Sequence, residues 1–158
     1  MSTSPDLAPH RNRFAVLPPE RAARWLETFP PLDPPTLGSV LGLRTEEVRL
    51  DYARLRLPYR PDLIQPAGVV HGGAIATLID TVVVPALASP YESFPQLLTI
   101  DLQIQFMAAL RGEDAIAEGW VVKRGRSIAF CRAEVLAASG ELVATGTLTY
   151  RVRSRDAA

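Results

Sequence analysis

The most informative segment of the chain for its fold is QPAGVVHGGAIATLIDTVVVPALAS, residues 65–89. It begins as a turn rich in proline and glycine, passes through a His-Gly-Gly motif at 71–73, and continues as a long apolar run. The polar side chains of that run are Thr77, Asp80 and Thr81. A helix over this run is apolar on nearly every face, so we expect it to be buried. Because an unpaired buried charge costs several kcal/mol, Asp80 must be paired, neutralised or used in chemistry.

Composition narrows the class of protein. The chain has 158 residues, 47% of them hydrophobic and 22% charged, which predicts one domain with a real core. Seventeen basic residues balance 17 acidic ones, so nothing in the net charge favours nucleic acid or an anionic membrane as a partner. A single cysteine, Cys131, excludes an intrachain disulfide, and with only two histidines we expect no structural metal site.

We expect a cytoplasmic protein, because the first residues carry no apolar signal segment and no apolar run is long enough to cross a membrane. The predicted organisation is an N-terminal arm and short helix over residues 1–37, a main domain over 38–153 and a tail over 154–158. Residues 1 to about 17 are expected to be disordered. A helix should follow to about Phe29, with Trp25 and Phe29 on its apolar face, covering the core or lining a substrate pocket.

The remaining segments have the period of two that is typical of strands. Two strands, Thr45–Asp51 and Tyr52–Tyr59, precede the central helix. Four follow it: Leu98–Phe106, Ala115–Lys123, Ser127–Ala137 and Leu142–Val152. Short connections containing glycine join the last three strands, which predicts an antiparallel meander. The sequence therefore predicts an α+β fold in which a curved antiparallel sheet wraps around one apolar helix.

Several motifs resemble the signature of one family. Gln65-Pro66-x-Gly68-x-x-His71-Gly72-Gly73, followed by Leu78-x-Asp80, is similar to the pattern of hotdog-fold acyl-CoA thioesterases of the phenylacetate-degradation (PaaI-like) type. Further matches occur in order at 99–101, 111–113 and 123–127, so that the resemblance spans about residues 38–151. It implies a hotdog fold, a homodimer or homotetramer, and hydrolysis of an acyl-CoA without a metal or redox cofactor.

The residues of the central helix suit that chemistry. Backbone N–H groups at Gly72 and Gly73, at a helix N-terminus, favour developing negative charge on a carbonyl oxygen. Asp80 would be the nucleophile or the general base. It lies roughly 12 Å along the helix from Gly72, too far for one carbonyl group to touch both. Two helices packed antiparallel about a two-fold axis would set Asp80 of one chain against Gly72 of the other, which predicts a dimer with composite sites.

Other readings of these residues stay open. The glycines could simply let the helix pack closely, and Asp80 could be a salt-bridged or capping carboxylate at a subunit seam. His71 is expected to orient the thioester by bonding to backbone or to Gln65, whose amide would hold the carbonyl oxygen. Thr99 matches a family position where a hydroxyl holds the attacking water, or it is an ordinary outward-facing strand residue. The pairing of a glutamine with an aspartate leaves direct attack and water activation both open.

The phosphates of coenzyme A require local cations in a chain of zero net charge. The candidates for contacts with the substrate or with CoA are Gly73, Arg111, Arg124, Gly125, Arg126 and Ser127. For the arginines, the other reading is that they are solvated turn residues.

We expect thioester hydrolysis of a small, medium or aromatic acyl-CoA. The alternatives are a hotdog dehydratase or hydratase, and a non-catalytic acyl-CoA-binding module. The acyl group, the oligomeric state beyond a dimer and the role of the N-terminal helix stay undecided from the sequence.

Overall fold

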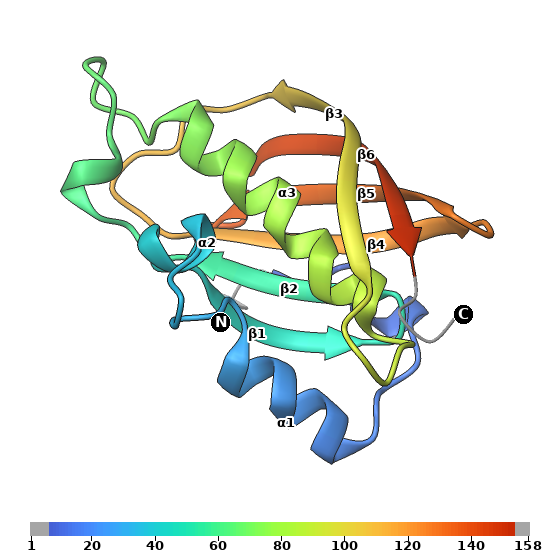
Figure 1. Ribbon diagram of the computed structural model, residues 1–158. Helices are drawn as coiled ribbons and strands as arrows, with labels where there is room; N and C mark the ends of the chain where they lie inside the picture. Colours follow the sequence, from blue (N-terminus) through green and yellow to red (C-terminus); the bar gives the residue numbers. More distant parts are fainter. Residues whose placement is uncertain (1–6, 154–158) are drawn as a thin grey trace, which may run out of the picture.

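A computed structural model describes residues 7–153. It contains one six-stranded antiparallel sheet, in the order β1-β2-β4-β5-β6-β3, that wraps around helix α3, Gly72–Ala88 (Figure 1). The strands are β1 Arg44–Arg49, β2 Tyr52–Leu57, β3 Gln96–Phe106, β4 Ala115–Arg124, β5 Ile128–Ala137 and β6 Leu142–Arg153. This arrangement confirms the predicted α+β fold, including the meander of the last three strands.

The other helices are short. Helix α1, Pro19–Thr28, confirms the helix predicted before the proline-rich connector, and helix α2, Leu37–Val40, was not predicted. The single turn of α2 is held by a capping box between Thr36 and Ser39. Two 3-10 turns, η1 Arg11–Arg13 and η2 Pro61–Leu63, complete the elements. No helix in the described part of the chain is long and apolar enough to cross a membrane.

The apolar character of α3 is explained by its place inside the curve of the sheet. Leu78, Ile79 and Val82 are fully buried. Two strand glycines let the helix sit this close: a Cβ at Gly119 would lie 2.7 Å from Val82 Cγ1, and one at Gly146 would lie 2.6 Å from Ile79 Cγ2. Any larger residue at either position would push the helix away from the sheet.

The prediction of a disordered N-terminal arm is wrong for residues 7–17. This segment packs on the face of the sheet opposite α3, where His10 Nε2 lies 2.8 Å from Glu134 Oε2 and Val16 forms a bridge to Arg49. The buried carboxylate of Glu118 supplies a physical reason, because the backbone N–H of His10 donates to it. Residues 1–6 and the predicted tail at 154–158 lie outside the described part of the chain.

Strand β3 departs from the predicted alternation. Its register with β6 shifts between Thr99 and Asp101, so Ile100 is an extra residue in a β-bulge. Before the bulge Thr99 pairs with the buried Tyr150 and faces α3, whereas Leu98 and Ile100 are 49% and 57% exposed. Thr99 is therefore directed toward the helix and not outward.

Candidate active site

Asp80 lies in the middle of α3 and is held by two hydroxyl groups. Thr99 Oγ1 donates to Asp80 Oδ1 at 3.0 Å, and Tyr150 Oη donates to the same oxygen at 2.5 Å. Burial, together with the neighbouring Asp80 charge, raises the pKa of Tyr150 above its ordinary value, so this phenol keeps its proton and remains a donor. The carboxylate is thus stabilised by hydrogen bonds from β3 and β6.

The start of α3 is organised by His71. As the N-cap residue, it accepts a hydrogen bond on Nδ1 from the Gly73 N–H at 2.8 Å, and this bond assigns the ring proton to Nε2. The Gly73 donor is therefore already engaged. Gly72 occupies the first helical position, where an N–H has no intrahelical acceptor and can donate to a ligand.

The turn before His71 is held by its own backbone and side chains. Gln65 Oε1 accepts from the Ala67 N–H at 3.2 Å, and Gly68 adopts a positive φ of 72° that glycine tolerates well. Arg111 Nη1 lies 3.4 Å from the Ala67 carbonyl oxygen, which places this predicted CoA ligand beside the turn. Gln65 and His71 each bond to the backbone of their own segment, so of the two partners expected for His71, the backbone and Gln65, the structure shows the backbone.

Two grooves run along the exposed side of α3. A groove of about 390 Å³ contains Asp80, and a second groove, of about 320 Å³, contains His71 and Gly73. Leu37 and Thr77 line both. The carboxylate and the helix start are thus neighbours on one surface but stay roughly 12 Å apart within the chain.

The other predicted CoA-binding residues lie at the far end of the helix. Arg124 Nη2 forms an ion pair with Asp51 Oδ1 at 2.6 Å and donates to the Leu87 carbonyl at 3.0 Å. Gly125 donates its N–H to the Ile128 carbonyl oxygen at 2.8 Å, and Arg126 and Ser127 are exposed in the turn between β4 and β5. The start and end of α3 are roughly 24 Å apart, so one chain does not bring Arg111 and this turn together.

Tyr150 is a site residue that the sequence analysis missed. It lies on β6, is 2% exposed, and comes 70 residues after the carboxylate that it contacts. Its alternation within β6 predicts only that it faces the core. Among the described residues there is no cluster of three or more metal-ligating side chains.

The outer edge of β3 is a further feature of the region around Asp80. Within the described chain β3 ends the sheet, pairing only with β6, and it is 11 residues long. Several large apolar side chains on or beside it are exposed: Leu98, Ile100, Phe106 and Met107. A long apolar edge strand of this kind is a template for pairing with another chain.

Comparison with known proteins connects this geometry to a family. Residues 67–144 match the family model described as the thioesterase superfamily. An esterase-like protein from Halobacterium salinarum is 34% identical over 148 residues, covering 85% of this chain and 95% of that protein. The human protein named acyl-coenzyme A thioesterase 13 is 33% identical over 84 residues, which span 52% of this chain and 59% of the human protein.

A solved structure gives the same result. A mutant form of the phenylacetic acid degradation protein PaaI from Thermus thermophilus superposes with a TM-score of 0.66 at 25% identity, covering 73% of this chain and 96% of that one. The fold, the motif from the Gln65 turn to Asp80, and these relatives agree. The chain therefore belongs to the thioesterase superfamily, as a PaaI-like hotdog-fold thioester hydrolase.

Proposed function

We propose that this protein hydrolyses an acyl-CoA to the free acid and CoA, with the Asp80 carboxylate as nucleophile or general base. The observation that carries the proposal is the arrangement of the Asp80 carboxylate beside an open groove. Thr99 and Tyr150 both bond to Oδ1, so Oδ2 is the oxygen available for reaction. A side chain held by two fixed donors is pre-organised for a defined attack geometry.

Two routes fit this arrangement. In the first, Oδ2 attacks the thioester carbonyl carbon, the C–S bond breaks, CoA leaves as the thiolate, and water hydrolyses the acyl-aspartyl anhydride. In the second, Oδ2 takes a proton from water while the water oxygen attacks the same carbon; the C–S bond then breaks, and the CoA thiolate leaves and takes the proton from Asp80. Both routes develop negative charge on the carbonyl oxygen. The free N–H of Gly72 at the helix start would stabilise that charge, with the Nε2–H of His71 or the Gln65 amide placing the thioester.

The edge of β3 supports a homodimer that joins the two halves of the site. Antiparallel pairing of β3 with its copy about a two-fold axis at Gln103 would keep inward-facing residues opposite one another. Beyond the bulge at Ile100, this register sets Thr99 opposite the partner's Phe106. The Phe106 ring lies only 3.2 Å from the position a Gly72 Cβ would occupy, while Thr99 contacts Asp80.

The proposed register therefore carries Asp80 of one chain toward the partner's Gly72, and each dimer has two composite sites. It also suggests how cations from opposite ends of α3 would reach one CoA: Arg111 beside the helix start of one chain, and Arg126 of the turn between β4 and β5 from the other. Arg124 would contribute indirectly, because its ion pair with Asp51 holds that turn against the end of α3.

Thiol release from a panel of straight-chain and aromatic acyl-CoAs tests the proposal, with Asp80→Asn as the variant. Asparagine keeps the size of the side chain and an oxygen that accepts from Thr99 and Tyr150, so folding and assembly should persist. We expect turnover by the wild type and a loss of at least about a thousandfold in the variant, since a reacting group is removed. Equal turnover by both proteins would contradict the role of Asp80, and no turnover by either would favour a binding module.

A further inference from the structure

The groove at Asp80 has one wall that does not belong to the sheet or to α3. The connector between α1 and α2 supplies Phe29 and Pro30, and the start of α2 supplies Leu37; these line the groove together with Thr77 and Thr81 of α3. The N-terminal segment thus builds part of the candidate active site, and does not merely cover the core.

This wall is fixed to the rest of the molecule. Arg21 Nη2, on α1, donates to the carbonyl oxygen of Ser89 at 2.6 Å, directly after the end of α3. Thr45 Oγ1, on β1, donates to the carbonyl oxygen of Phe29 at 2.7 Å. Helix α1 and Phe29 at its end are therefore anchored, and the Phe29 side chain is held where it lines the groove.

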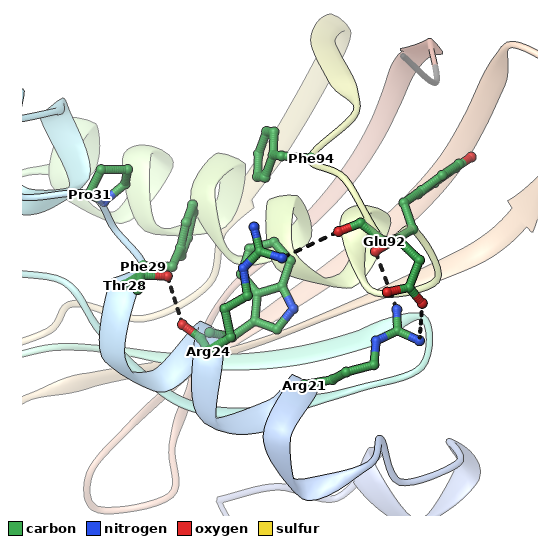
Figure 2. A pocket seen from close by; sticks show the side chains of 9 residues that line it. Arg21, Arg24, Thr28, Phe29, Pro31, Glu92 and Phe94 are labelled. Carbon is green, nitrogen blue, oxygen red and sulfur yellow. Dashed lines mark hydrogen bonds and ion pairs between the residues drawn. The ribbon is translucent and has the colours of Figure 1, made fainter. Parts of the chain in front are cut away.

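A second cleft, of about 140 Å³, lies on the other side of Phe29. The Trp25 ring stands edge-on to Phe29 at 5.7 Å between centroids, and 6.0 Å from the ring of Phe94. Figure 2 shows Phe29 and Phe94 entering this cleft from different elements, Phe29 from the end of α1 and Phe94 from the segment between α3 and β3. Among the described residues, Phe29 alone lines both the groove at Asp80 and this aromatic cleft.

The chemistry of the groove selects the kind of acyl group that fits. Apart from Asp80, the residues of 7–153 that line it have apolar or neutral side chains and include no lysine or arginine. An acyl group with a terminal carboxylate would meet no cation there and would lie near the charge of Asp80. An apolar chain would lose contact with water against Phe29, Pro30 and Leu102.

From these observations, and on the basis of the proposed function, we infer that the groove binds an uncharged apolar acyl chain and that Phe29 sets its maximum length. The carbonyl group would lie at Asp80 and the chain would extend along α3 toward the α1 connector. The Phe29 ring then separates the acyl groove from the aromatic cleft.

The test is kcat/KM for straight-chain acyl-CoAs of increasing length. Each buried methylene contributes about 0.8 kcal/mol, so kcat/KM should rise about fourfold per carbon until the chain reaches Phe29, and then level off. We call the chain length at which kcat/KM levels off the break. Phe29→Ala should open the groove into the cleft and move this break to chains longer by at least about two carbons. Phe29→Trp should move it to shorter chains. Leu26→Ala is the matched control, because Leu26 is an exposed apolar residue of α1 that lines neither space, and its break should not move.

The outcomes separate the two proposals. A wild type that hydrolyses no thioester would refute the proposed function itself. A wild type whose activity has no break, or a break that stays in place in folded and active Phe29→Ala and Phe29→Trp proteins, would refute the inference alone. So would hydrolysis of succinyl-CoA as fast as butyryl-CoA, because the two differ mainly in a terminal carboxylate. Phe29→Leu, a smaller change, keeps the test valid if Phe29→Ala fails to fold.

Discussion

The hydroxyl of Tyr150 donates a hydrogen bond to Asp80 Oδ1 at 2.5 Å, linking strand β6 to the middle of α3. Thr99 donates to the same oxygen. In a helix whose other side chains are nearly all apolar, these two donors offset the cost of placing a carboxylate there. In the proposed function they leave Oδ2 as the reacting oxygen.

We predict that Tyr150→Phe lowers kcat by about ten- to a hundredfold, because a hydrogen bond to a charged group contributes about 1.5–3 kcal/mol. KM should change little, since the phenol does not need to touch the substrate. Steady-state kinetics that resolve kcat from KM check both expectations.

Thr99→Val is the companion variant, because it removes the other donor to the same oxygen. If both hydroxyls act through Asp80, the double variant should lose less activity than the product of the two single losses. A Tyr150→Phe enzyme with a lower thermal midpoint but an unchanged kcat would show that the residue is merely structural.

Gly72→Pro is predicted to lower kcat by about 10²–10³, the loss seen when one oxyanion donor is removed. Proline lacks the N–H but is favoured at the first helical position, and the extended conformation of His71, with ψ of 132°, suits the residue before a proline. Gly72→Ala is the control, since it keeps the N–H and meets the same Phe106 ring. Equal losses in the two variants would assign the effect to crowding.

Mixing two inactive variants tests whether the site is shared between chains. In a dimer of one Asp80→Asn chain and one Gly72→Pro chain, a composite site would combine the intact Asp80 of the second with the intact Gly72 of the first. Random exchange makes half of the dimers mixed, each with one intact site, so about one quarter of wild-type activity should return. If each chain held a complete site, co-refolding the variants would restore nothing.

Gln103→Cys should form an intermolecular disulfide under mild oxidation, because the proposed two-fold axis sets residue 103 opposite its own copy. Non-reducing electrophoresis would show the crosslinked dimer. Cys131 does not interfere, as it is buried and burial raises its pKa to about 12. Gln105→Cys, another exposed β3 residue, should not crosslink, because its copy would lie several residues away along the strand. Crosslinking of residue 105 in preference to 103 would show that the two-fold axis does not lie at Gln103.

Glu118→Gln tests the protonation of the buried side chain that accepts a hydrogen bond from the N-terminal arm. Burial raises the pKa of Glu118, despite hydrogen bonds from Tyr52 and from the backbone of His10. A raised pKa means that the folded state holds this proton more tightly than the unfolded state. Its stabilising contribution is thus present below about pH 4.5 and is lost as pH rises through the folded pKa.

The free energy of unfolding of the wild type should accordingly fall relative to that of Glu118→Gln as pH rises from 4 to 7. Urea denaturation of both proteins across this range measures the difference, and contributions from other titrating groups cancel. A constant difference would show that Glu118 does not change its protonation in this way.

Much of the fold follows from local pattern. The apolar run around Asp80 predicted the buried helix, and the period of two predicted all six strands. Both patterns show which side chains are buried when the chain folds. The order of motifs from Gln65 to Asp80 also placed the two halves of the candidate site on one helix. That they are too far apart for one carbonyl group follows from the helical rise alone.

Other features depend on contacts between distant segments. The bulge at Ile100 turns Thr99 toward Asp80, and neither an alternating strand nor its composition reveals a one-residue insertion in its register. The sequence of residues 7–17 does not show by itself that they pack on the sheet, yet the buried Glu118 accepts a hydrogen bond from the backbone of His10, more than 100 residues away.

Hydrophobic periodicity and the cost of burying charge are enough to predict the central helix, its sheet and a carboxylate that needs a partner. Which partner that carboxylate has depends on the tertiary structure. Tyr150 meets Asp80 because the sheet curves around α3 and brings β6 to the helix, and Phe29 lines the same groove because Arg21 and Thr45 hold its segment there. These contacts depend on the path of the whole chain, which the spacing of residues within one segment does not predict.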